Sequence, residues 1–514
     1  MELLALIFIS LILFTAMNKQ FQKFGIGFLN PLSWILSFLS KPPTKADGMM
    51  SKQDEIKTFS RFNDGLLVDG KNKRLSAKES FNHLALFSRT GGGKTTSYVL
   101  PNIYKLAKQN CSMVITDLSG EIYEKTSAYL NSQGFKIYVL DPKNLDESIR
   151  YNPLEYAKDS MSVDTVSEIL ISSAGLKGTN ADSRIWSDGA KNIISILIKV
   201  LNATDDKRYM NLANVKYLLN NIGKKVIVEN EDGSKEIAPL IEEFIRRYAD
   251  DKTFSEYTGF INGNPKTVQG FIATANIALS PIGINDNLEK LTYSHSIDFK
   301  KFREEKSVVF IKIEQQHQEQ YSFLLNLFYS QLFNEMMNKL PSAKDLHLYC
   351  LLDEFGNMNI PRFSSVITTI RKYKVSISII LQNINQLINQ YSENEAKTIL
   401  DGGIASKLIY SGADLDLGSS LEKMFGYKET LKQQADGTNR YEKESVMDVS
   451  EIRTMKDNEA LFVYANKKPL KMSVKPYYKD MMYNGFSKLK PYQIKGVNRY
   501  DSVQYVDLEN VEWD

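Results

Sequence analysis

A glycine-rich run that follows an apolar stretch carries the strongest chemical signal in this sequence. It reads Ser88-Arg89-Thr90-Gly91-Gly92-Gly93-Lys94-Thr95-Thr96, and a helix-like segment comes after it. Consecutive glycines let backbone N–H groups surround phosphate oxygens, and the N-terminus of a following helix adds a favourable dipole. Lys94 can then reach the β- and γ-phosphates, and the Thr95 hydroxyl can hold Mg²⁺. The run predicts a nucleotide-binding loop; the alternative is a glycine-rich turn that happens to precede Lys-Thr. Ser88 replaces the first glycine of the usual pattern, but the phosphate cradle depends most on Gly91 to Gly93.

A pair of carboxylates after a second apolar run adds the other half of this chemistry. Residues 348–352 have the near-continuous apolar character of a buried parallel strand, and they end at Asp353 and Glu354. In nucleotide hydrolases with such a loop, the Asp holds the Mg²⁺ shell and the next Glu can polarise the attacking water. The alternative is a strand that ends in two solvated carboxylates. Together with Lys94, the pair predicts a hydrolytic site.

Two further polar residues are candidates for sensing and for action on a neighbouring subunit. Gln382 ends the next strand-like run, where a side chain that both donates and accepts could face the γ-phosphate and the attacking water. The alternative for Gln382 is a polar cap of a strand. Arg371 ends a helix-like segment, and an arginine at a domain edge can reach a neighbouring subunit's phosphate as an arginine finger. The alternative for Arg371 is a basic edge, shared with Lys372 and Lys374, that is solvated or contacts nucleic acid.

Composition places the chain among ordinary globular proteins. It has 514 residues, 43% hydrophobic and 24% charged, and a formal net charge of +3, so a nucleic-acid-binding surface would have to be local. Its two cysteines lie in apolar strand-like runs and are expected to be reduced core residues; a disulfide framework is not indicated, which fits a cytosolic main body. The four histidines show no metal-ligand spacing.

The N-terminus differs from the rest. Residues 3–17 are apolar and uncharged, although they are fewer than the roughly 20 residues that a full membrane span prefers. Lysines follow on the C-terminal side, so the positive-inside rule places the bulk of the chain in the cytoplasm. A second apolar stretch, 24–39, is either an interfacial helix or a second short span. Residues 1–40 are therefore predicted to be a cell-membrane anchor, and the polar, proline-marked residues 41–60 a linker.

The remaining pattern predicts an α/β protein with a helical insert. Strand-like runs alternate with helical ones over residues 61–153 and again over 289–480, which implies a parallel sheet. Residues 154–288 are mostly helical in spacing and read as an inserted all-α domain, with a hint of strands only near 225–237. Residues 481–514 form a tyrosine-rich C-terminal tail of mixed charge.

At this point the motifs resemble those of a family, the TraG/TraD-like coupling-protein ATPases of type IV secretion and bacterial conjugation. The main signature is Leu351-Leu352-Asp353-Glu354-Phe355-Gly356-Asn357-Met358 followed by Leu381-Gln382-Asn383. Supporting pieces are Thr116-Asp117 with Gly120-Glu121, then Asp141-Pro142, Tyr151-Asn152-Pro153-Leu154, Trp186 before a long helix, and the stretch Leu461–Tyr478 near the end. The resemblance covers roughly residues 60–480. Two departures are Leu118-Ser119, where the family often has Pro-Lys, and a short N-terminal region, where many relatives carry two spans.

The resemblance implies a membrane-attached homo-hexamer with a RecA-like P-loop nucleotide hydrolase domain and an all-α insert. It implies ATP and Mg²⁺ as cofactors, with Thr95 and Asp353 at the metal and Glu354, Gln382 and Arg371 in catalysis. The expected partners are single-stranded DNA with its relaxase and the proteins of the type IV secretion channel, through which ATP hydrolysis would drive transfer. Two alternatives remain open: an FtsK-like DNA translocase, and a membrane receptor that binds nucleotide without hydrolysis.

Overall fold

The structure, a computed structural model, describes residues 48–176, 181–229, 235–317, 320–433, 439–494 and 502–508. The predicted anchor, residues 1–40, lies outside these ranges. Among the described residues, no helix combines the length and the apolar character needed to cross a bilayer.

The chain divides into two compact units, and each is described by itself. The smaller one includes residues 426–446, whose described part is an antiparallel hairpin of β10 (Tyr427–Gln433) and β11 (Asn439–Ser445). The larger one comprises residues 50–425 and 447–514 and contains every other described element.

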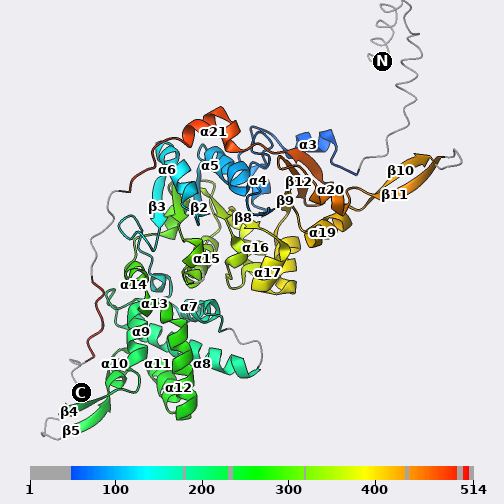
Figure 1. Ribbon diagram of the computed structural model, residues 1–514. Helices are drawn as coiled ribbons and strands as arrows, with labels where there is room; N and C mark the ends of the chain where they lie inside the picture. Colours follow the sequence, from blue (N-terminus) through cyan, green and yellow to red (C-terminus); the bar gives the residue numbers. More distant parts are fainter. Residues whose placement is uncertain are drawn as a thin grey trace, which may run out of the picture. The chain divides into compact units, whose positions relative to one another are not determined.

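The larger unit is built on a nine-stranded sheet with the order β13-β12-β9-β1-β8-β7-β2-β6-β3 (Figure 1). The seven strands from β9 to β3 are parallel, while β12 and β13 are antiparallel at one edge. The strands are β1 (Leu84–Phe87), β2 (Cys111–Thr116), β3 (Lys136–Leu140), β6 (Ser307–Ile311), β7 (His347–Leu352), β8 (Val375–Leu381), β9 (Ser406–Tyr410), β12 (Glu459–Tyr464) and β13 (Leu470–Ser473).

Helices cover both faces of this sheet, which explains why its central strands are apolar throughout. One face packs on η1, α5, α6 and α21 through Tyr104, Tyr129 and Tyr483, and the other packs on α15 and α16. The Thr116 and Tyr329 hydroxyls are 2.8 Å apart on this second face.

Helical elements of this part are α3 (Lys52–Thr58), α4 (Ala77–Ser80), η1 (Lys94–Val99), α5 (Leu100–Leu106), α6 (Glu121–Ser132), η3 (Phe299–Arg303), η4 (Gln315–His317), α15 (Ser322–Met337), η5 (Phe355–Asn357), α16 (Phe363–Thr369), η6 (Ile370–Tyr373), α17 (Ile384–Tyr391), α18 (Glu393–Lys397), η7 (Thr398–Gly403), α19 (Leu415–Phe425), α20 (Val449–Arg453), η8 (Tyr477–Lys479) and α21 (Met481–Phe486).

A mostly helical segment separates β3 from β6. Its elements are η2 (Pro153–Tyr156), α7 (Ser160–Ser173), α8 (Ala181–Ala203), α9 (Leu212–Asn221), the antiparallel pair β4 (Lys225–Glu229) and β5 (Lys235–Pro239), α10 (Leu240–Tyr248), α11 (Asp251–Ile261), α12 (Pro265–Ala278), α13 (Ser280–Ile284) and α14 (Asp286–Tyr293). Side-chain caps begin most of these helices; the Asp159 carboxylate, for example, accepts N–H bonds at the start of α7. We call residues 153–293 the helical insert.

Two helices of this insert interlock through glycines. A Cβ at Gly189 of α8 would lie 2.3 Å from the Phe271 ring of α12, and a Cβ at Gly270 of α12 would lie 2.3 Å from the Trp186 ring of α8. Each aromatic ring therefore occupies the space that a glycine leaves on the facing helix. The Trp186 and Phe271 rings meet edge to face with centroids 5.5 Å apart.

The sequence-based elements mostly agree with the structure. The alternation of strands and helices gives a mixed α/β sheet, and the hint of strands near 225–237 corresponds to β4 and β5. The hairpin β10–β11 is an element that the sequence pattern did not predict. The boundaries of the separate predicted domains stay predictions.

A candidate nucleotide site at the carboxyl edge of the sheet

The strand order brings the predicted site residues to one edge of the sheet. β8 lies between β1, which leads into the glycine-rich loop, and β7, which leads into Asp353. Because these strands are parallel, their carboxyl ends meet at the same edge. The loop joins the end of β8 directly: the Ser88 N–H donates to the Leu381 carbonyl at 3.0 Å.

Backbone geometry in the loop requires glycine. Gly91 and Gly93 adopt φ values of +73° and +87°, in the left-handed region that other residues rarely occupy. Gly92 is needed for space, since a Cβ there would lie 2.5 Å from the Ser88 Oγ. Ser88, the departure from the usual glycine, is buried under the loop and is compatible with this turn. The loop ends in the π-helical turn η1, whose first residue is Lys94.

Lys94 meets both predicted carboxylates. Its Nζ lies 3.1 Å from Asp353 Oδ1, and it also forms an ion pair with the Glu354 carboxylate. Gln382 completes the group, with its Nε2 3.4 Å from Glu354 Oε2. Glu354 has a φ of +54°, a strained value for a residue with a side chain, of the kind that functional sites retain. Four residues predicted from separate motifs thus form one contiguous cluster.

Burial sets the electrostatics of this cluster. Burial alone would lower the pKa of Lys94, but the carboxylates of Asp353 and Glu354 outweigh it and raise that pKa, so the ammonium stays charged. Burial raises the pKa of Asp353, although Lys94 acts in the opposite direction. Lys94 therefore remains positively charged, and a bound phosphate group could replace the two carboxylates as its ion-pair partner.

A pocket of about 510 Å³ opens beside the loop. Gly91 to Ser97 form one wall, and Tyr478, Lys479 and the neighbouring Pro476 belong to the other. Asp457, Asn458, Val474 and Glu121 complete the lining. Sequence analysis noted Glu121 only as part of the family resemblance and did not assign it to the site. Asp457 and Asn458 were missed, because they lie far from the loop in the chain and carry no motif. Thr95 and Thr96 line the pocket, and their contact with a nucleotide or metal stays a prediction.

Three predicted loop residues lie outside the lining of this pocket. Ser88 is buried, Thr90 is exposed, and the exposed Arg89 pairs with Asp457 at 3.1 Å. Asp457 also accepts a hydrogen bond from the Ser411 hydroxyl at 2.9 Å. Direct contact of these three with phosphate stays a prediction.

Arg371 is not part of the cluster within one chain. It belongs to η6, which precedes β8, whereas Gln382 follows β8. The seven residues of β8 span roughly 23 Å at about 3.3 Å per residue, so Arg371 lies at the opposite edge of the sheet. Its predicted role on a neighbouring subunit stays a prediction.

The residues present fit a magnesium-bound nucleotide. Mg²⁺ is usually held by one or two protein oxygens together with phosphates and water, and Thr95 and Asp353 are of that kind. Among the described residues, no group of three or more His, Cys, Asp or Glu side chains could hold a metal by itself. A metal here would depend on phosphate oxygens beside Lys94.

The profile of the type IV secretory system conjugative DNA transfer family matches residues 40–505. The chain belongs to this family. No curated protein sequence matches the chain.

Solved structures of one coupling protein share the fold of this family member. The unbound bacterial conjugative coupling protein TrwBdeltaN70 has 15% sequence identity and a TM-score of 0.64, over 85% of this chain and 93% of that one. TrwB with the GTP analogue GDPNP has 15% identity and a TM-score of 0.65, over 88% and 96%. TrwB with ADP and Mg²⁺ has 15% identity and a TM-score of 0.63, over 83% and 93%. At this identity the likeness establishes the fold.

Proposed function

We propose that this protein is a membrane-anchored ATPase that couples a relaxase–DNA or protein substrate to a type IV secretion channel and drives its transfer by ATP hydrolysis. The single observation that carries the hydrolytic part is the cluster of Lys94, Asp353, Glu354 and Gln382 at one sheet edge. The match to the conjugative DNA transfer family supports the transfer part.

Each residue of the cluster has a role that its position supports. The backbone N–H groups of Gly91 to Gly93 and the Lys94 ammonium hold the phosphates, and Thr95 and Asp353 hold Mg²⁺, which neutralises charge on the phosphates when bound. The Glu354 carboxylate orients a water and accepts its proton, and Gln382, 3.4 Å from that carboxylate, fixes its direction. The printed titles of TrwB structures name ADP with Mg²⁺ and an ATP analogue, which supports ATP and Mg²⁺ as cofactors here.

The assembly and the partners belong to the same proposal. A homo-hexamer would place Arg371 of one subunit near the nucleotide of the next, where its fixed charge could stabilise the transition state. Single-stranded DNA would be held by sequence-tolerant phosphate contacts, and residues 1–40 would anchor the ring in the cell membrane with its bulk in the cytoplasm.

Family membership favours this reading over an FtsK-like translocase. The second alternative, a receptor that binds nucleotide without hydrolysis, does not need a carboxylate placed to polarise water. Glu354 lies beside Lys94 and Gln382 and adopts a φ of +54°, and these features support the hydrolytic proposal.

The proposal is tested by steady-state ATP turnover of the full chain, with and without single-stranded DNA. Glu354→Gln preserves size but removes the base, so we expect turnover to fall by about 100-fold or more. The matched control is Glu124→Gln, an exposed glutamate on α6, which should retain wild-type turnover. Unchanged turnover in Glu354→Gln would refute the hydrolytic assignment, and a wild-type rate insensitive to DNA would refute the DNA-transfer part.

A further inference from the structure

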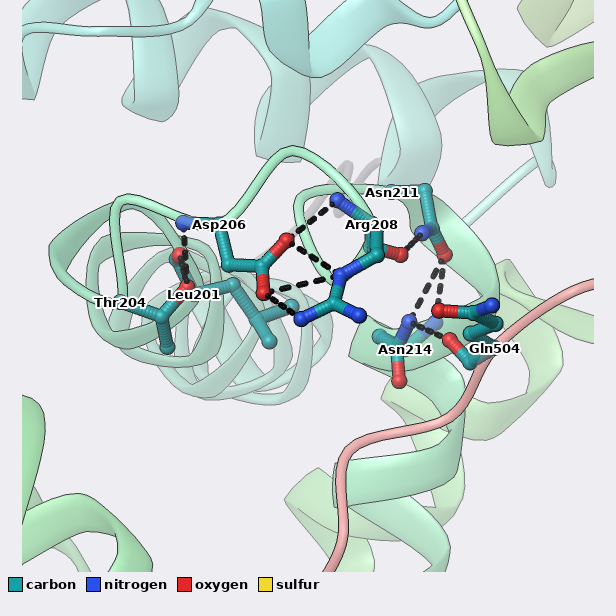
Figure 2. Close-up of polar contacts among 7 residues, drawn as sticks. All are labelled: Leu201, Thr204, Asp206, Arg208, Asn211, Asn214 and Gln504. Atoms are coloured by element: carbon teal, nitrogen blue, oxygen red, sulfur yellow. Dashed lines mark hydrogen bonds and ion pairs between the residues drawn. The ribbon is translucent and has the colours of Figure 1, made fainter.

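A short C-terminal segment lies on the helical insert. Residues 502–508 form neither a helix nor a strand, and the side chain of Asn214 of α9 bonds twice to their backbone. Asn214 Nδ2 donates to the Gln504 carbonyl at 2.9 Å (Figure 2), and the Val506 N–H donates to Asn214 Oδ1 at 2.9 Å. One amide side chain thus supplies the donor and the acceptor that a neighbouring β-strand would supply.

Asn214 is fully buried and held in position by a polar chain (Figure 2). Asn211 Oδ1 accepts from the Asn214 N–H at 3.0 Å and from its Nδ2 at 3.2 Å. Asn211 Nδ2 in turn donates to the Arg208 carbonyl at 2.8 Å, and the Arg208 guanidinium pairs with Asp206 at 2.6 Å. Because these bonds fix the amide without using its second N–H or its full acceptor capacity, Asn214 is set up for an extended backbone.

The last three residues of the segment, 506–508, alternate between buried and exposed. Val506 and Leu508 are each 2% exposed, whereas Gln504, Tyr505 and Asp507 are exposed. The Tyr505 hydroxyl donates to Glu289 of α14 at 2.6 Å, and its ring lies 5.0 Å from that of Tyr217 of α9. The surface formed by α9 and α14 therefore accepts a peptide with apolar residues at positions i and i+2 and an aromatic hydroxyl at position i−1.

We propose that this surface, the α9–α14 groove, is a peptide-binding site that residues 502–508 fill as an internal ligand. Its exchange partner is an extended segment of a protein delivered for transfer, with the same alternation of apolar residues. The backbone contacts through Asn214 do not depend on ligand sequence, so any segment with two suitable apolar residues can replace the internal one. A ligand on the same chain benefits from a high effective concentration, so weak docking keeps the groove filled and still permits exchange. The source of the exchanging peptide rests on the proposed function; the groove does not.

The test uses the full chain and a fluorescent synthetic peptide, Ser-Val-Gln-Tyr-Val-Asp-Leu, which copies residues 502–508. The double substitution Val506→Asp and Leu508→Asp should release the internal segment, so we expect the peptide to bind this variant at least about tenfold more tightly than wild type. Adding Asn214→Ala to the double variant should remove at least that gain. Asn221→Ala is the matched control, because the side-chain amide of this buried asparagine of α9 donates to the Tyr217 carbonyl of the same helix; it should leave peptide binding intact.

Several results would overturn the proposal. Equal peptide affinity for wild type and the double variant would mean that the internal segment does not block the groove. Binding of the copied sequence but not of a peptide with isoleucine at both apolar positions would exclude exchange with a transferred protein. Dimers that form only in the wild type would assign the groove to a second copy of the chain.

Two further measurements separate this proposal from other failures. In wild type, the Val506 amide should exchange its hydrogen slowly, and Asn214→Ala should accelerate that exchange while thermal unfolding shows a folded protein. ATP turnover without partners should be unchanged in all these variants, since none touches the nucleotide site. Normal ATP turnover without peptide binding would therefore contradict the proposed peptide-binding site but not the proposed function. A wild-type protein that does not turn over ATP would contradict the proposed function but not the peptide-binding site.

Discussion

Lys94 lies beside two carboxylates that would otherwise repel each other. Its ammonium is shielded from water, as are the side chains of Asp353 and Glu354, with 13–17% of each exposed. A phosphate arriving at the loop would compete for the lysine, which would free Glu354 to act on water and Asp353 to bind metal. We therefore expect nucleotide binding to break the ion pairs that Lys94 forms with Asp353 and Glu354.

A second residue, the buried His83, makes the free energy of unfolding depend on pH. It is fully buried at the start of β1, and its Nδ1 accepts the Ile377 N–H at 3.1 Å, which requires a neutral ring. Burial lowers the pKa of His83 to about 3. A folded-state pKa below the unfolded value means that the stabilising contribution is present above about pH 6.5 and is lost as pH falls from there towards 3.

We expect wild type to lose about 2 kcal/mol of unfolding free energy from this group between pH 7 and pH 5. The measurement is urea unfolding at both pH values. His83→Asn should lose correspondingly less, because asparagine can accept the same N–H, tolerates the φ of +61° and does not titrate. The exposed His317→Asn should behave as wild type. An equal loss in His83→Asn and wild type would contradict the assignment.

Among the elements, the glycine contacts between α8 and α12 give a direct test of packing. Gly189→Ala gains helix propensity, about 0.5–1 kcal/mol, but forces its Cβ against the Phe271 ring. Overpacking of this kind costs about 1–3 kcal/mol, so we expect a net loss of about 1–2 kcal/mol in thermal or urea unfolding. Gly259→Ala in α11 is the matched control, since its Cβ would meet nothing within 4 Å, and it should be neutral or stabilising. A stabilised Gly189→Ala would show that the two helices do not pack this closely.

The limits of sequence prediction are also visible among the elements. The apolar runs of β2, β7 and β8 were predictable, because strands buried on both faces leave a continuous hydrophobic signal. The sequence pattern predicts one helix over residues 385–400. In the structure this helix is broken where Ser392, at a φ of +76°, caps α18 with its side chain. The hairpin β10–β11 was missed because half of its strand residues are charged, and the few apolar ones, such as the paired Leu431 and Tyr441, give no clear alternation.

The candidate site shows a similar division. Lys94, Asp353, Glu354 and Gln382 were found because each follows a recognisable strand. Asp457, Asn458 and Tyr478 were not, because only the antiparallel edge of the sheet brings them beside the loop. Long-range pairing of this kind has no local signature in the chain.

At the scale of the whole larger unit, hydrogen bonds join the segment that follows Asp353 and Glu354 to the helical insert. The Asn359 N–H, five residues after Glu354, donates to Asn326 Oδ1 at 3.1 Å, and Asn326 Nδ2 donates to Ser173 Oγ of α7 at 3.0 Å. A nucleotide that moves Glu354 would therefore act on a segment bonded to the insert, which is a physical route between hydrolysis and a bound substrate.

The central claim is that Lys94 and Asp353 serve one magnesium-bound nucleotide, and the most direct test is a high-resolution structure of the full chain with Mg²⁺ and a non-hydrolysable ATP analogue. The account predicts phosphates along Gly91 to Gly93, Lys94 turned from Asp353 to the phosphates, and the metal at about 2.0–2.1 Å from the Thr95 hydroxyl on the side of Asp353. Phosphates bound elsewhere, or a Lys94 still paired with Asp353 beside a bound nucleotide, would contradict it.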